Sequence, residues 1–401
     1  MNRSLMLFLM PALAAFAVGC GGSDSSETAT ATDKANGEPI VIGTANSLTG
    51  ILAPFESAIN NGMDVAVDDI NAAGGVDGRP IKIIHVDAKS DLNLSATAAL
   101  DVIEKGAQIV VPMCDADFGG PGARAANEKG VLAITCAGAP GIGRQTIGPL
   151  TFNTYGGAPT ESAINAEYAY KTMGWRRAYV LCDQLVEYTK VVCDAFKTRW
   201  KSLGGTIVGE DTFLQTDVSI SPQVTRLANA PKPDFVMLAS FPGGSPAIRE
   251  IRAAYDGPIV LAAAYSGTFW LTATPHLSNV WVAAVGSSYG DDPREDVNAF
   301  FRKYKTRTGL AAQVDSYPLL GYSLVQTIAK GVEMAGTTEG KALAEALETF
   351  KDTPLLAGPT TYTKNCHVPV NRSLLIIRYE DGKPSSTGDL VRPEQVPPYP
   401  C

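Results

Sequence analysis

Residues 40–86 read IVIGTANSLTGILAPFESAINNGMDVAVDDINAAGGVDGRPIKIIHV, and this stretch decides the fold class. It opens with a short apolar run, Ile40–Ala45, which predicts a buried strand. In Pro54–Ala73 the apolar residues recur at helical spacing, and Gly74-Gly75 can end that helix. A second apolar run, Ile81–Val86, completes a strand–helix–strand unit. Nearly continuous apolar strands that alternate with helices predict a parallel sheet covered on both faces.

The same alternation continues along the chain, and its 401 residues are enough for two domains. We expect two similar doubly wound α/β lobes, and from Arg294 a mainly helical segment, then a final strand, Ser373–Arg378, and a Pro-rich tail. The further strands are expected at Gln108–Met113, Val131–Thr135, Ala178–Cys182, Thr206–Phe213, Phe235–Ala239, Ile259–Ala263 and Val280–Val285.

The N-terminus has the pattern of an export signal. Arg3 precedes an apolar run, Leu5–Val18, which is too short to span a bilayer comfortably. Ala17-Val18-Gly19-Cys20 resembles a bacterial lipobox, and the polar stretch Gly21–Gly37 is typical of a flexible tether. We expect a lipoprotein signal peptide over 1–20, a tether over 21–38, and a lipid anchor at Cys20 that holds the protein in the cell envelope, outside the cytoplasmic membrane. An ordinary signal peptide cut nearby, or a short membrane anchor, is the alternative.

The composition and the absence of known motifs argue against several kinds of partner and site. The net charge is −8 and no Lys/Arg cluster stands out, which argues against nucleic-acid binding. The three histidines, His85, His276 and His367, are scattered and no CxxC pair exists, so we expect no metal site. The sequence lacks a phosphate-binding or dinucleotide fingerprint and a GxSxG elbow. We therefore expect no cofactor and no enzymatic activity.

Six cysteines remain beside Cys20, an even number that suggests disulfides in an exported chain. The preferred pairing is Cys114–Cys136, whose members end strands expected to be neighbours, and Cys182–Cys193, whose members are close in sequence. Cys366–Cys401 is left by elimination. Scattered buried thiols are the alternative.

The loops that follow the predicted strands are rich in Gly, Ser, Thr and aromatic residues. Because open parallel sheets bind ligands at the carboxyl ends of their strands, we expect a ligand site there. These loops are 46–55, 114–118, 136–142, 183–188, 240–244 and 265–270.

Four stretches resemble one known family. They are Ser47–Gly50, Asp68–Ile81, Gly130–Leu132 leading to Thr135–Ala137, and Ala357–Thr360. Together they are similar to the type I periplasmic binding proteins of branched-chain amino acid transporters, the Leu/Ile/Val-binding group, over about Pro39–Tyr379.

The resemblance implies two lobes joined by three crossing strands that close on a ligand by a hinge motion. The crossings are expected near Phe152–Gly156, Val285–Ser288 and Gly358–Thr361. Lobe I then comprises 39–154 plus 286–358, and lobe II 155–285 plus 359–401. The implied function is a monomeric substrate-binding protein that serves the permease and ATPase of an ABC importer. A ligand sensor on the same fold, signalling to a membrane partner, is the alternative.

This sequence matches the family's ligand-binding residues only in part. Phe55 lies where the family often has an aromatic residue, Asp115 lies where it has a carboxylate-binding serine, and Phe241 lies where a tyrosine is common. No acid near Tyr265-Ser266 matches the one that pairs the ligand's ammonium, and Ala139 replaces a hydroxyl residue. Asp117 either contacts ligand or caps the helix predicted over Gly119–Lys129; Asp183 either faces the ligand or caps a turn. The full set of expected ligand-binding residues is Phe55, Asp115, Ala116, Asp117, Ala137, Gly138, Ala139, Tyr188, Phe241, Tyr265 and Ser266.

This pattern predicts a small, largely apolar or aromatic ligand rather than a simple branched-chain amino acid. An amino acid needs both charges paired once the lobes close, because an unpaired buried charge is costly.

Overall fold

A computed structural model describes residues 35–309, 315–370 and 372–398 of the chain. The signal segment 1–20 with Cys20, most of the expected tether, and Cys401 lie outside the described residues.

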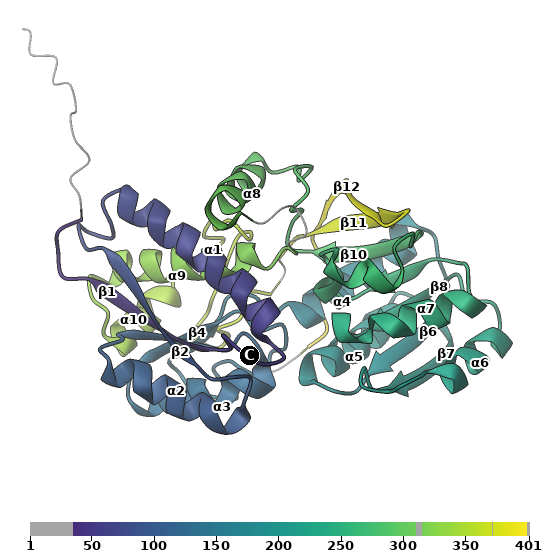
Figure 1. Cartoon of the computed structure of the whole chain (residues 1–401), viewed down its shortest axis with the longest axis horizontal. Helices are drawn as coiled ribbons and strands as arrows, with labels where there is room; N and C mark the ends of the chain where they lie inside the picture. Colours follow the sequence, from purple (N-terminus) through teal and green to yellow (C-terminus); the bar gives the residue numbers. More distant parts are fainter. Residues whose placement is uncertain (1–34, 310–314, 371, 399–401) are drawn as a thin grey trace, which may run out of the picture. The chain divides into compact units, whose positions relative to one another are not determined.

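The first sheet has the strand order β2-β1-β3-β4-β5, and all its pairings are parallel. Its three short strands β3, β4 and β5 are buried over their whole length, which explains the mainly apolar sequences of β3 and β4. Helices α1, α2 and α3 each follow a strand (Figure 1). The elements are β1 (Ile40–Asn46), α1 (Ala53–Ala72), β2 (Ile81–Asp87), α2 (Leu92–Glu104), β3 (Ile109–Pro112), α3 (Ala116–Glu128), β4 (Leu132–Thr135) and β5 (Thr151–Asn153).

The second sheet has the order β12-β11-β10-β9-β8-β6-β7. Its pairings are parallel from β7 to β10, so the prediction of an α/β fold with two parallel-sheet lobes is confirmed. A π-helical turn, Tyr168–Thr172, extends α4. The elements are α4 (Gly157–Glu167), β6 (Arg177–Asp183), α5 (Glu187–Ser202), β7 (Thr206–Phe213), α6 (Ser221–Asn229), β8 (Phe235–Ala239), α7 (Ser245–Ala254), β9 (Ile259–Leu261), β10 (Val280–Ala284), β11 (Leu374–Glu380) and β12 (Lys383–Val391).

The prediction that the strand Ser373–Arg378 is the last was wrong, because residues 383–391 form a further strand. This segment is β12, which pairs antiparallel with β11, and β11 pairs antiparallel with β10. Asp381 and Gly382 connect β11 to β12 with φ angles of 50° and 69°. An Asp-Gly pair with both φ values positive is the preferred two-residue hairpin turn, and it was the signal in the sequence.

Three helices that come after β10 pack with the first sheet's elements. They are α8 (Glu295–Thr308), α9 (Pro318–Ala335) and α10 (Gly340–Leu347). Helix α9 packs along α1, α8 also contacts α1, and α10 contacts α9 and β4. The chain thus returns to the neighbourhood of the first sheet after building most of the second; the exact lobe boundaries remain predictions.

Two glycines allow α1 and α9 to touch backbone to backbone. A Cβ at Gly321 would lie 2.0 Å from the Ile59 carbonyl oxygen, and one at Gly62 would lie 2.1 Å from the Pro318 carbonyl oxygen. Any larger residue would push the helices apart. The close approach is therefore fixed by these two positions.

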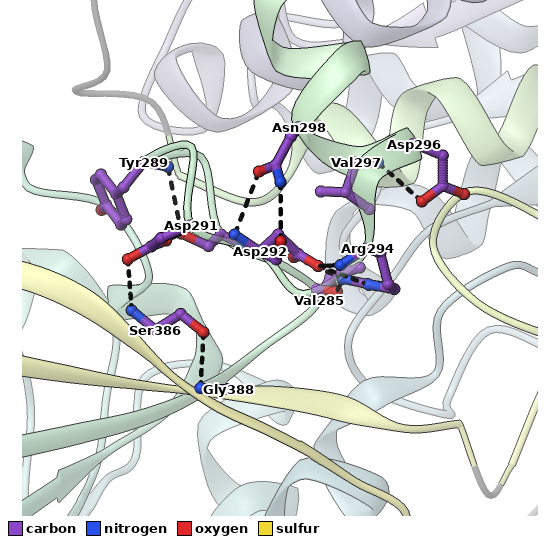
Figure 2. A network of polar contacts seen from close by, with 11 residues as sticks. Val285, Tyr289, Asp291, Asp292, Arg294, Asp296, Val297, Asn298, Ser386 and Gly388 are labelled. Atoms are coloured by element: carbon purple, nitrogen blue, oxygen red, sulfur yellow. Dashed lines mark hydrogen bonds and ion pairs between the residues drawn. The ribbon is translucent and has the colours of Figure 1, made fainter.

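A polar network orders the segment between β10 and α8, where a crossing was expected (Figure 2). The Arg294 guanidinium donates to the Val285 carbonyl at 2.8 Å and forms an ion pair with Asp292, N···O 2.9 Å. The Ser386 N–H of β12 donates to the Asp291 carboxylate at 2.8 Å. The segment is thus tied both to the start of α8 and to the edge of the second sheet.

Candidate functional site

Two of the expected disulfides are present at the sheet ends. Cys114–Cys136 joins the segments after β3 and β4, with Cα atoms 4.8 Å apart, and Cys182–Cys193 joins β6 to α5, with Cα atoms 5.8 Å apart. Cys366 is also a disulfide cysteine, and its expected partner, Cys401, lies outside the described residues. The first bond fixes the loop that carries Asp115 and Asp117 next to the loop that carries Ala137 to Ala139.

Asp115, not Asp117, is the N-cap of α3. Its carboxylate accepts a hydrogen bond from the Phe118 N–H at 3.0 Å, and the helix begins at Ala116 rather than at Gly119. Burial raises the pKa of Asp115 to about 6. The Asp117 carboxylate instead accepts a hydrogen bond from the Glu187 N–H at 2.9 Å, which links α3 to the start of α5. A cap of α3 was one of the two roles expected for Asp117, and the structure gives that role to Asp115.

Gly138 and Phe241, from the loops after β4 and β8, come together with Tyr188 from the first turn of α5. A Cβ at Gly138 would lie 2.5 Å from the Tyr188 ring, and the centroids of the Tyr188 and Phe241 rings are 5.0 Å apart. The Ala137 carbonyl accepts hydrogen bonds from the Gly156 N–H and the Asn153 side chain, each at 3.0 Å. Glycine at position 138 therefore lets an aromatic ring from the second sheet rest on a loop of the first.

Phe55 contacts an aromatic residue that the sequence analysis did not select. Its ring meets Tyr317 edge to face, with centroids 4.5 Å apart. Tyr317 is buried, and burial together with the charges of Asp315 and Glu161 raises its pKa. Ala116, which follows Asp115, and Ala139, which follows Gly138, are small buried residues.

Tyr265 and Ser266 have structural partners. The Tyr265 hydroxyl donates to the Phe241 carbonyl and its ring meets Trp270 edge to face at 5.1 Å. The Ser266 hydroxyl lies 3.1 Å from the Ser316 hydroxyl and accepts from the Ser316 N–H at 3.2 Å. Tyr265 is fully buried, so it supports the backbone of Phe241 rather than presenting a free ring.

The structure brings an acid from another element close to the segment that precedes Tyr265-Ser266. Glu161, in the first turns of α4, is fully buried and accepts a hydrogen bond from the Ala263 N–H at 3.3 Å. It also accepts from the hydroxyls of Tyr188 at 2.7 Å and Tyr155 at 3.2 Å. Burial raises its pKa to about 8. Sequence spacing gave no signal, because Glu161 and Ala263 are far apart in the chain.

Asp183 orders the loops after β6 and β8. Its carboxylate accepts from the N–H groups of Leu185 and Gln215, at 3.0 and 3.2 Å, and from the Ser240 hydroxyl at 2.9 Å. These hydrogen bonds agree with the alternative that Asp183 caps a turn rather than faces the ligand. Figure 1 places these loops at the ends of the strands of the second sheet.

Other features of the described residues do not compete with this site. A surface hollow between α1 and α8 is lined by Asp69 and Lys303, whose charged groups pair at 2.8 Å. Within residues 35–309, 315–370 and 372–398, no group of three His, Cys, Asp or Glu side chains could hold a metal ion. No helix in that part of the chain is long and apolar enough to cross a membrane.

Two α/β units with aromatic and acidic groups gathered at the strand ends define a protein of the two-lobed solute-binding class. The chain belongs to the periplasmic binding protein family, whose model matches residues 39–383, and it is similar to members of the type I, branched-chain amino acid transporter kind. The family implies an extracytoplasmic location, and the relatives found are binding proteins, not enzymes.

The chain is 26% identical over 350 residues to the Leu/Ile/Val-binding protein BraC3 of Rhizobium johnstonii, covering 86% of this chain and 92% of that one. Its fold is similar to the branched-chain amino acid binding protein LivJ of Streptococcus pneumoniae in complex with isoleucine, with a TM-score of 0.77, 22% identity, and coverage of 89% of this chain and 100% of the other. It is also similar to an R. palustris solute-binding protein in complex with benzoate, with a TM-score of 0.71, 20% identity, and coverage of 87% and 96%.

Proposed function

We propose that this protein is the substrate-binding lipoprotein of an ABC importer, acting as a monomer that captures a small organic solute and delivers it to a permease and ATPase complex. The observation that carries the proposal is the meeting of groups from both sheets: the Tyr188 ring rests on Gly138, and the Glu187 N–H donates to the Asp117 carboxylate at 2.9 Å. Groups so placed can close on a ligand from two sides.

The ligand that these groups fit best is a small, largely apolar or aromatic molecule. Phe55, Tyr317, Tyr188 and Phe241 offer ring faces and edges. Burying about 150 Å² of apolar ligand surface at about 25 cal/mol per Å² contributes about 4 kcal/mol. The R. palustris structure with benzoate supports this class of ligand.

A simple α-amino acid fits less well. Glu161 lies close to the segment before Tyr265-Ser266, yet its oxygens already accept three hydrogen bonds and its raised pKa of about 8 keeps it mostly protonated near neutral pH. The Asp115 carboxylate at the expected ligand-carboxylate position is used in capping α3. Neither ligand charge therefore has an obvious counter-group at the family's usual positions.

Calorimetry with purified protein tests the ligand. We expect benzoate or a related aromatic solute to bind, and leucine, isoleucine and valine to bind weakly or not at all. Phe241→Ala should weaken binding at least tenfold. The control variant Tyr170→Ala, in the π-helical turn that follows α4, should leave binding unchanged. Tight binding of any of the three amino acids would overturn the ligand assignment.

The transport role and the anchor are tested in cells. Labelling with a radioactive fatty acid should mark the wild-type protein and not Cys20→Ala. Deleting the gene should abolish uptake of the solute identified by calorimetry. Equal labelling of both proteins would refute the anchor, and unchanged uptake would refute the importer role.

A further inference from the structure

Arg372, between the third expected crossing and β11, carries a buried charge without a counter-ion. Its side chain is 3% exposed. Its Nη2 donates to the Thr360 hydroxyl at 2.6 Å, but its Nε and Nη1 have no hydrogen-bond partner. Across residues 35–309, 315–370 and 372–398, no carboxylate forms an ion pair with it. Buried guanidinium groups are normally paired, so these free donors need an explanation.

The described neighbours of Arg372 enclose its side chain and supply no carboxylate to it. Tyr362 and Tyr155 are coupled electrostatically to it, and so is a second cation, Arg294. A Cβ at Gly358, where φ is +117°, would lie 3.3 Å from the aliphatic stem of Arg372, so the backbone passes close over the side chain. Burial lowers the pKa of Arg372 to about 10, which leaves it charged near neutral pH.

Arg294 is an arginine whose charge and hydrogen-bond donors have partners within the protein. Figure 2 shows its guanidinium held by the Asp292 carboxylate and the Val285 carbonyl, at 2.9 and 2.8 Å. That cation is neutralised within the protein. Arg372 has no equivalent of Asp292.

Tyr155 connects Arg372 to the candidate site. Its hydroxyl donates to Glu161 at 3.2 Å, and its pKa is raised by burial and Glu161 and lowered by Arg372. The tyrosine thus contacts the acid beside Tyr188 and also responds electrostatically to the unpaired guanidinium.

We propose that the free Nε–H and Nη1–H groups of Arg372 bind a compact anion, either the carboxylate of the captured solute or a free inorganic anion. Guanidinium N–H groups form strong, charge-assisted hydrogen bonds to such anions. The carboxylate case rests on the proposed solute-binding function and would place the charge-recognising group on a different segment from the family's usual serine position. The inorganic case does not depend on that function.

The test measures thermal unfolding of the whole processed chain during titration with sodium benzoate, acetate or chloride, with isethionate keeping the ionic strength constant. We expect at least one of the three anions to raise the midpoint of the wild type, because a ligand that binds only the folded state stabilises it. Arg372→Gln should require at least tenfold more of that anion for the same shift. Arg378→Gln, which removes an exposed charge from β11, should behave as the wild type.

A second measurement, the stability of Arg372→Gln without added anion, shows whether the substitution itself disturbs the fold. Without added anion, Arg372→Gln should be at least as stable as the wild type, because it removes an unpaired buried charge. A shift with benzoate or acetate but not chloride assigns the site to the solute's carboxylate; a shift with chloride assigns it to an inorganic anion. Equal responses of wild type and Arg372→Gln, or no response of the wild type to any of the three anions, would overturn the proposal. If benzoate binds both proteins equally, solute capture stands and the role of Arg372 fails.

Discussion

Replacing Glu161 by glutamine tests whether a neutral carboxyl group joins the elements around the candidate site. Burial raises its pKa from 4.5 to about 8, so between these values the folded protein holds a proton that the unfolded chain has released. The stability linked to this group is fully present below the unfolded pKa and is lost as the pH rises through about 8. Glutamine resembles the protonated form and cannot lose that proton.

The size of the effect follows from the same pKa. Between pH 7 and 9 the wild type should lose about 1.4 kcal/mol of unfolding free energy through Glu161, since one pKa unit corresponds to about 1.4 kcal/mol. The variant should lose none through this position. It should instead lose about 1–3 kcal/mol at every pH, because a tyrosine hydroxyl that now donates to Glu161 must turn to accept from the amide N–H₂, and its own donor bond is then lost.

Urea unfolding followed by tryptophan fluorescence at pH 7 and 9 gives both quantities. Burial also raises the pKa of Glu56 to about 8, so the wild type alone would not isolate Glu161. The difference between wild type and Glu161→Gln does. If the two proteins lose the same free energy between these pH values, Glu161 is ionised throughout and the reasoning fails.

Three further outcomes are expected. Gly321→Ala should destabilise the protein by about 1–3 kcal/mol through overpacking of α1 against α9, whereas Gly120→Ala, whose nearest contact would be 3.8 Å away, should stabilise it by up to about 1 kcal/mol; reversed signs in urea unfolding would contradict the packing. Replacing Cys114 and Cys136 together by serine should cost about 3 kcal/mol, as expected for a loop of this length, and an unchanged unfolding midpoint would argue against the bond. Phe241→Ala should reduce affinity for an aromatic solute at least tenfold while the circular dichroism spectrum stays unchanged; unchanged affinity would remove Phe241 from the site.

Much of the fold was predictable because its signals are local. The strand Phe235–Ala239 was expected with the bounds that the structure has, and most other strands differ by one or two residues. Runs of apolar residues and helical spacing depend only on neighbours in the chain. The hairpin of β11 and β12 was missed although its Asp381-Gly382 turn is also a local signal.

Parts of the candidate site were predictable and parts were not. The sequence placed Gly138, Tyr188 and Phe241 at strand ends, and the structure brings them into contact. It offered Asp117 rather than Asp115 as a possible cap of α3, because an N-cap cannot be located until the first helical residue is known. Tyr317 was missed because its partner, Phe55, is distant in sequence.

The sequence by itself indicated most of the strands in their order, the family resemblance and the preferred pairing of two disulfides at the strand ends. Only the tertiary structure decided which charged groups lost contact with water and which partners they gained. Glu161 reaches the Ala263 N–H from another element, and Arg372 is buried without a carboxylate beside it. Periodicity follows from local geometry, whereas burial and pairing depend on contacts between residues far apart in the chain, and those contacts set the charge and the chemistry of the site.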